Sequence, residues 1–373
     1  MARIFLSLSG EGRGHATRAR AVVESLRERH EISLFASGDA WRFLAPLYRD
    51  TPVQVHRIGG LRFHYTETRR LNFSRTGAEA LRFLRRLPML VGMLERQIQR
   101  GRPDLVVTDF EPALPRAARR CGVPFLSLDH QHFLLTYDLS GLPPALRLHA
   151  AYMALIVRAY CSGQAETIVS SFYFPRLRQG CHQVTQVGVM LRPEVLAARP
   201  ERAGHLVAYF RRFGGDHLLA ALQASGRAVR VYGLGARPAA GRLTFHDIEE
   251  RRFVEDLAAC DALVSTAGNQ LVGEALHLGK PVLALPEARN FEQYINAHFL
   301  AQSGAGAWRE AEKLTPADVT AFLGRLGNFC PSPDAARIHG LPATLEVIRR
   351  HLPAAKPATH SLPRHDEVPL AAR

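Results

Sequence analysis

The segment 262–305 constrains the fold more than any other part of the chain, because short apolar runs alternate in it with helical patterns. Ala262–Val264 has the length of a buried strand, and apolar residues recur at helical spacing from Gln270 to Leu278. A glycine and a proline end that helix, and a second strand follows at Val282–Leu285. Two strands joined through a helix form a parallel unit, so we expect an α/β fold.

The N-terminus repeats this pattern. Arg3–Ser9 is an apolar strand, a glycine-rich loop follows, and residues 16–29 carry an amphipathic helical stripe before a second strand at Glu31–Ser37. The chain has 373 residues, of which 47% are hydrophobic, and this is enough for two domains. We therefore expect two doubly wound, Rossmann-like domains.

We expect the domain boundary at residue 192. Val184–Val187 is the last strand before a linker that contains glycine and Pro193. The predicted domains are residues 1–192 and 193–352. The segment 353–373 is rich in Pro, Ala and His, and we expect a disordered tail there.

The turn after the strand at 262–264 has the features of an anion site. Backbone N–H groups and the positive end of a helix meet at Gly268–Gln270, where a phosphate or diphosphate can bind. Glu274 lies about one turn further along and can accept hydrogen bonds from a ribose diol, while Glu292 and Gln293 can hold sugar hydroxyls. An ordinary βαβ unit with a solvated Glu274 would have the same pattern, so the spacing alone leaves both readings open.

The same stretch resembles the donor-binding half of GT-B glycosyltransferases, in particular family 28 and the UDP-glycosyltransferases. The residues that carry the resemblance are Gly268, Glu274–Ala275, Gly279–Pro281, Pro286, Glu292–Tyr294 and Asn296–Ala297. The resemblance implies a GT-B fold whose second domain binds a nucleotide sugar. It implies that Glu274 binds ribose, that Glu292 and Gln293 bind the donor sugar, and that the turn formed by Thr266, Ala267, Gly268, Asn269 and Gln270 contacts the diphosphate.

Two further features belong to this resemblance. Residues 253–257 resemble the loop that reads uracil through main-chain groups, which makes Phe253 and Val254 candidate base contacts. Many relatives carry His or Arg as a phosphate partner where this chain has Thr266. The diphosphate must then rely on backbone groups, on Thr266, or on an arginine from elsewhere, such as Arg211 or Arg212.

His15 follows the loop Gly10–Gly14 and lies at the carboxyl end of the first strand, where open α/β sheets bind ligands. From the residues alone it is either a functional base or a helix-capping or core histidine. GT-B enzymes carry a similar glycine-rich loop that ends in His, and in UDP-glycosyltransferases this His is the general base. The resemblance makes His15 the catalytic base and Gly12 and Gly14 substrate contacts.

Acidic residues follow the next strands at the same edge of the sheet. Asp109 ends an apolar strand, and we expect it to orient His15, with Glu111 as the competing partner. Asp129 and His130 follow another strand and are candidate acceptor contacts. No third ligand is spaced near the histidines of this loop, so we expect no metal site and no cofactor.

The net charge of +14 comes almost entirely from arginine, which favours anionic partners such as nucleotides or lipid headgroups. We find no pattern typical of nucleic-acid binding.

The segment Ala78–Arg100 is basic and amphipathic, with Pro88 expected to kink or interrupt it. It is either a membrane-surface helix or a core helix with arginines on its wet face. We expect no signal peptide in the first residues, and the five scattered cysteines indicate free thiols in a reducing compartment.

The sequence thus predicts a cytoplasmic GT-B glycosyltransferase, peripheral on the inner face of the membrane. It would move a hexose or N-acetylhexosamine from a nucleotide sugar, UDP-linked, to a hydroxyl of a lipid or cell-envelope glycan, with inversion and without metal. Two alternatives remain at this point: a nucleotide-sugar 2-epimerase on the same fold, and a non-catalytic relative that binds nucleotide or lipid.

Overall fold

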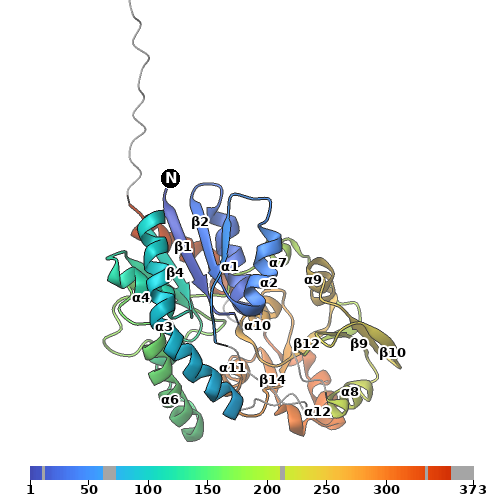
Figure 1. Cartoon of the computed structure of the whole chain (residues 1–373). Coiled ribbons are helices and arrows are strands. Elements are labelled where there is room, and N and C mark those ends of the chain that lie inside the picture. The colour runs from blue at the N-terminus through green and yellow to red at the C-terminus, as the bar shows by residue number, and fades with distance from the viewer. Residues whose placement is uncertain (11–12, 62–72, 211–214, 332–334, 354–373) are drawn as a thin grey trace, which may run out of the picture.

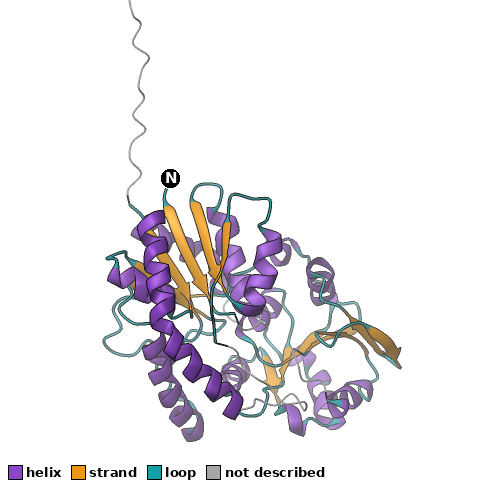
Figure 2. Ribbon diagram, in the orientation of Figure 1, coloured by secondary structure: helices purple, strands orange, loops and turns teal. Residues whose placement is uncertain are grey.

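The computed structural model describes residues 1–10, 13–61, 73–210, 215–331 and 335–353. Each half of the chain forms one seven-stranded sheet with helices on its faces (Figures 1 and 2). The expected pair of doubly wound domains is therefore confirmed. Gly12, Arg211, Arg212, much of the loop 59–65 and nearly all of the tail lie outside the described residues.

The first sheet has the strand order β3-β2-β1-β4-β5-β6-β7, and every neighbouring pair is parallel. Its strands are β1 (Arg3–Leu8), β2 (Glu31–Ala36), β3 (Gln54–Arg57), β4 (Leu105–Asp109), β5 (Phe125–Asp129), β6 (Glu166–Ser170) and β7 (Val184–Val187). The helices of this half are α1 (Arg13–Leu26), α2 (Gly38–Leu47), α3 (Phe73–Gly101), α4 (Ala113–Arg120), α5 (Phe133–Thr136) and α6 (Pro144–Tyr160). Every residue of β4 and β5 is buried, as expected for central strands covered on both faces.

The second sheet has the order β10-β11-β9-β8-β12-β13-β14. Its strands are β8 (His205–Tyr209), β9 (Ala228–Tyr232), β10 (Arg237–Ala240), β11 (Leu243–His246), β12 (Ala262–Ser265), β13 (Val282–Ala284) and β14 (Gly306–Trp308). Its helices are α7 (Pro193–Ala197), α8 (Asp216–Gln223), α9 (Glu250–Ala259), α10 (Asn269–His277), α11 (Phe291–Gln302), α12 (Pro316–Leu323) and α13 (Ala335–Ile338). Only the edge strand β10 is antiparallel among the described pairs; it is exposed and contains Pro238, which an edge position tolerates.

The last helix, α14 (Leu341–His351), returns to the first domain (Figure 1). Val347 and Ile348 join the core formed by β1 and α1, and Arg350 and His351 bind the carboxylate of Glu166. The chain therefore crosses between the domains twice, and the second crossing fixes the C-terminal helix on the N-terminal sheet.

Helix α3 continues through Pro88 without interruption, in contrast to one of the two outcomes predicted for it. The helix buries Phe83 before the proline and Leu90, Val91 and Leu94 after it in one core cluster. Burying a side chain of this size contributes about 1.5–3 kcal/mol, so the four together outweigh the cost of about 3 kcal/mol for a proline within a helix.

Candidate active site at the domain seam

The structure brings His15 and Asp109 into contact. His15 lies in the first turn of α1, Asp109 ends β4, and His15 Nδ1 is 2.8 Å from Asp109 Oδ1. The His15 side chain is 13% exposed, against 3% for Asp109, so the ring reaches the surface while the carboxylate behind it is buried. The contact predicted from the sequence is therefore present, and it leaves Nε2 as the ring nitrogen that can face a substrate.

Arg18 is a third member of this group that the sequence analysis missed. It lies one turn after His15 on α1, is 3% exposed, and donates from Nη1 to Asp109 Oδ1 at 2.9 Å. Asp109 Oδ2 and Arg18 Nε are buried and have no hydrogen-bond partner within the described residues. One carboxylate oxygen thus receives both His15 and Arg18.

Glu111, the alternative partner for His15, has a different role. Its carboxylate accepts hydrogen bonds from the backbone N–H groups of Ala113 and Leu114, so it caps the start of α4. Burial raises the pKa of Glu111, and these N–H groups oppose the shift. Phe110, between the two acids, has a left-handed backbone with φ of 52°, which turns the chain sharply between them.

The start of α10 lies opposite this group, on the second domain. β12 ends at Ser265, Ala267 adopts a left-handed backbone with φ of 61°, and Gly268 is the N-cap of α10. Strained backbone of this kind concentrates at functional sites. Helices α1 and α10 are in contact, and a Cβ built on Gly14 would lie 4.0 Å from Gln270 Cβ. The two helix starts therefore converge where the domains meet.

The side chains of Asn269 and Gln270 tie α10 to the first domain. Asn269 accepts from the backbone N–H of Phe172 and donates to the carbonyl of Ser170 at 3.0 Å. Gln270 donates to the carbonyl of Met190 at 2.8 Å. These two side-chain amides fix the position of the turn. An anion at the turn would therefore be bound by the backbone N–H groups of the turn.

Glu274 forms a buried ion pair with Arg192. Arg192 Nη2 lies 2.8 Å from Glu274 Oε2, its Nε lies 3.1 Å from Oε1, and the exposed fractions of the two side chains are 8% and 2%. Burial alone lowers the pKa of Arg192, but the Glu274 carboxylate outweighs it and raises the pKa. Both oxygens of Glu274 are engaged, so a ribose diol can reach them only if this pair opens or shares its bonds.

Phe253 and Val254 lie inside α9, not in a loop as the resemblance implied. Both side chains are buried in the core, and the backbone N–H of Phe253 donates to the carbonyl of Glu249. Glu249 caps this helix by accepting hydrogen bonds from the N–H groups of Arg251 and Arg252. The helix therefore begins before residues 253–257, the segment that resembled a loop. The role of Phe253 and Val254 as base contacts through main-chain groups stays a prediction, against which the helical hydrogen bonding of this segment weighs.

Glu292 and Gln293 lie at the start of α11. Glu292 faces the first domain, where Gln131 Nε2 donates to it at 3.3 Å. Gln293 accepts from the backbone N–H of Glu287 at 2.8 Å, and this bond shapes the loop before the helix. The pair therefore lies at the carboxyl end of β13, on the same seam as His15.

Asp129 and His130 reach this edge of the first sheet, but both are buried. Asp129 accepts from the backbone N–H and the ring of His132, and although burial opposes ionisation, His132 holds the pKa of Asp129 below its ordinary value. His130 contacts the carbonyl of Ser170 and Asn296 Oδ1, and burial lowers its pKa. Their role as acceptor contacts stays a prediction, against which this burial weighs.

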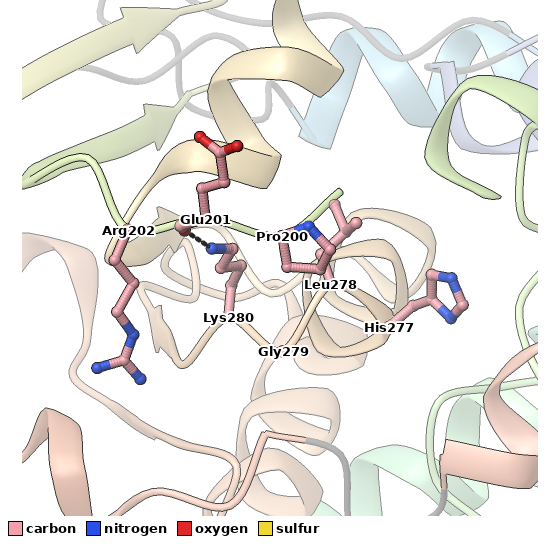
Figure 3. Close-up of a pocket in the computed structure, with 7 residues that line it drawn as sticks. All are labelled: Pro200, Glu201, Arg202, His277, Leu278, Gly279 and Lys280. Carbon is pink, nitrogen blue, oxygen red and sulfur yellow. Dashed lines mark hydrogen bonds between the residues drawn. The ribbon is translucent and has the colours of Figure 1, made fainter. Parts of the chain in front are cut away.

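A separate pocket of about 440 Å³ lies at the other end of α10 (Figure 3). Lys280 donates to the backbone carbonyl of Glu201 there. The lining residues are Pro200, Glu201, Arg202, His277, Leu278, Gly279 and Lys280. None of the predicted site residues lines this pocket, since they gather at the start of α10 and the pocket lies at its end.

In the part of the chain that the structure describes, no group of His, Cys, Asp and Glu side chains is suited to hold a metal ion. None of the helices within the described ranges is long and apolar enough to cross a membrane.

Known proteins resemble this chain in sequence and in fold. The family model described as Glycosyl transferase family 1 matches residues 2–327. A curated relative from Acidiphilium cryptum (strain JF-5) is the UDP-N-acetylglucosamine–N-acetylmuramyl-(pentapeptide) pyrophosphoryl-undecaprenol N-acetylglucosamine transferase. It is 28% identical over a match of 239 residues, and the match covers 62% of this chain. The chain spans 58% of the length of that relative.

Two solved structures are similar over their whole length. The calicheamicin glycosyltransferase CalG4 has a TM-score of 0.66 at 18% identity, covering 96% of this chain and 100% of its own. MurG from Acinetobacter baumannii has a TM-score of 0.59 at 17% identity, covering 94% and 100%. The expected GT-B fold is thereby confirmed.

Proposed function

Because this chain belongs to the glycosyl transferase family 1, we propose that it transfers a hexose or N-acetylhexosamine from a nucleotide sugar to an acceptor hydroxyl. The proposed donor is UDP-linked, as in the name of the curated relative, and the proposed acceptor is a lipid or a glycan of the cell envelope. The proposed domains are residues 1–192 for the acceptor and 193–352 for the donor.

The observation that carries this proposal is the convergence of two helix starts from different domains. The His15–Asp109 contact of 2.8 Å lies at the start of α1, and α1 contacts α10 beside Gln270. A diphosphate at the N-terminus of α10 would therefore lie next to a histidine whose second ring nitrogen is not used by Asp109. A base and a leaving-group site in this proximity suit group transfer between two bound substrates.

In the proposed mechanism, His15 Nε2 takes the proton of the acceptor hydroxyl while its oxygen attacks the anomeric carbon. Asp109 accepts the hydrogen bond from Nδ1, fixes the ring and stabilises the imidazolium that forms. The bond between the anomeric carbon and the diphosphate oxygen breaks, and UDP leaves on the opposite face, which inverts the configuration.

The backbone N–H groups at Thr266, Ala267, Gly268, Asn269 and Gln270 would stabilise the charge on the leaving diphosphate, so the proposal needs no metal ion. Glu292 and Gln293 would bind the donor sugar across the seam. Glu274 would bind the ribose once its pair with Arg192 rearranges. Gly12 and Gly14 would let the acceptor approach His15 closely, with Glu111 supporting the rim as the cap of α4.

We further propose that the enzyme works in the cytoplasm, on the inner face of the membrane, as a peripheral protein. Large apolar side chains are exposed on two helices of the first domain: Leu81, Leu84, Met89 and Met93 on α3, and Leu148, Tyr152 and Leu155 on α6. Exposed arginines accompany them at 82, 85, 86, 96, 147 and 158. An apolar face with a basic rim suits an anionic bilayer that carries a lipid acceptor.

The first test is a thermal-shift screen of the purified protein against UDP, GDP, dTDP and UDP-sugars. Ligand at about 100 times its Kd stabilises the folded state by about 2.7 kcal/mol. UDP compounds should raise the melting temperature of the wild type and of the control Glu255→Gln, whose side chain is exposed on α9, but not that of Glu274→Gln. If no nucleotide shifts the wild type, the donor site is refuted, and a lipid-binding relative becomes the better hypothesis.

The second test separates a transferase from a 2-epimerase. Incubation of the stabilising UDP-sugar without acceptor should leave the sugar's configuration unchanged, as read by proton NMR of the anomeric region. Conversion to the 2-epimer without any acceptor would contradict transfer as the principal activity.

A further inference from the structure

Arg18 is the least expected side chain of the site. It is 3% exposed, it lies on the same face of α1 as His15, and its Nη1 is 2.9 Å from Asp109 Oδ1. His15 Nδ1 is 2.8 Å from the same oxygen. Asp109 Oδ2 is buried without a partner within the described residues, so both hydrogen bonds go to Oδ1 although a second oxygen is present.

Sharing one oxygen has an electrostatic consequence. A carboxylate alone beside an imidazole favours the charged ring, whereas an arginine bound to the same carboxylate offsets that negative charge. Arginine keeps its proton at all relevant pH values, so the offset is permanent. A buried arginine with one strong bond and an unpartnered Nε is costly for folding, which argues for a role other than stability.

We propose that Arg18 is a positioning residue of the His15–Asp109 pair: it fixes the Asp109 carboxylate and offsets the charge that this carboxylate presents to the His15 ring. Asp129, the last residue of β5, and His130, which follows it, also interact electrostatically with Arg18. Asp129 is already paired with His132, so Asp109 is the carboxylate that Arg18 binds directly.

This inference rests on the proposed function for its purpose, but its measurement needs no substrate. The experiment is a pH titration of the histidine side chains by long-range proton–nitrogen NMR on the full-length, nitrogen-15-labelled protein, with His15→Gln identifying the His15 signals. Arg18→Met should move the pH at which His15 titrates upward by about one unit. Arg18→Lys, which keeps the charge, should move it by less than half of that.

Two variants make the result specific. Arg27→Met removes an arginine just after the same helix, where Arg27 pairs with Glu24, and should leave the His15 titration unchanged. In the Asp109→Asn background, Arg18→Met should shift the His15 titration less than it does in the wild-type background, because residue 109 then carries no charge for Arg18 to offset. Thermal unfolding of each variant verifies that it is folded, and Arg18→Gln, which also removes the charge but keeps a polar side chain, replaces Arg18→Met if that variant does not fold.

The proposal is overturned if His15 titrates at the same pH in wild type and in Arg18→Met or, where Arg18→Met does not fold, in Arg18→Gln. A shifted titration together with no nucleotide binding would support Arg18 and refute the proposed function. Nucleotide binding together with an unmoved titration would do the reverse.

Discussion

Replacing Arg192 by methionine should destabilise the second domain strongly. The change removes the partner of both Glu274 oxygens, which lie 2.8 and 3.1 Å from Arg192 nitrogens and are almost fully buried. Gln270 Nε2, at 3.0 Å, would be the donor that remains to Glu274 Oε1. Removing one partner of a buried pair costs about 3–5 kcal/mol, because the other charge stays behind without compensation.

The assay is guanidinium unfolding followed by fluorescence in a Trp41→Phe background, in which Trp308 of β14 is the remaining tryptophan and reports on the second domain. Arg227→Met is the matched control, since its pair with Asp261 at 3.2 Å is partly exposed and should contribute below about 1 kcal/mol.

A double-mutant cycle with Glu274→Gln tests the reasoning itself. Once the charge at 274 is gone, Arg192→Met should cost much less, and we expect a coupling energy above about 1.5 kcal/mol. If the two single changes add within about 0.5 kcal/mol, the pair does not act as a unit and the argument from burial fails.

Three other predictions use the same seam. His15→Gln should lower turnover of the donor identified in the screen by about 10²- to 10⁴-fold with little change in nucleotide affinity, and unchanged turnover would contradict its role as base. His132→Gln should flatten the loss of stability between pH 7 and 10, measured by urea unfolding at each pH. Burial lowers the pKa of His132, but Asp129 raises it to about 10, so its stabilisation is complete below the ordinary value and is lost as pH rises. Gly273→Ala should cost about 1–3 kcal/mol, because the new Cβ would meet Val189 at 2.5 Å; Val189→Ala should restore part of this, and a tolerated Gly273→Ala would show that the linker can move.

Helices and strands could be predicted from the sequence where their apolar residues recur at regular spacing, because that spacing indicates a buried face. The strand Val184–Val187 has the predicted bounds, and the strands predicted at Arg3–Ser9 and Glu31–Ser37 each end one residue earlier than expected. The edge strand β10 was not predicted, because all four of its residues are exposed and its pairing depends on β11, not on a pattern of its own.

The site was predictable in part, for a different reason. The carboxyl ends of parallel strands meet at one edge, so His15 after β1 and Asp109 at the end of β4 had to be neighbours. Nothing in the spacing could show that Arg18 shares this carboxylate or that Arg192 covers Glu274. Both contacts depend on which side chains face each other after folding, and the second also depends on how the linker meets α10.

The contacts between the domains explain why so many predicted ligand contacts are buried. His130, Asn269 and Asn296 join the two domains through hydrogen bonds of 3.0 Å, and the pair of Arg192 with Glu274 joins the linker to α10. These bonds run along the edge that also carries the proposed substrate groups. The distance from His15 to a diphosphate at α10 therefore depends on residues that take no part in the chemistry. A reading of the sequence identifies the reactive groups because their types are distinctive, whereas the amides and arginines that set their separation look like ordinary surface residues until the domains are placed together.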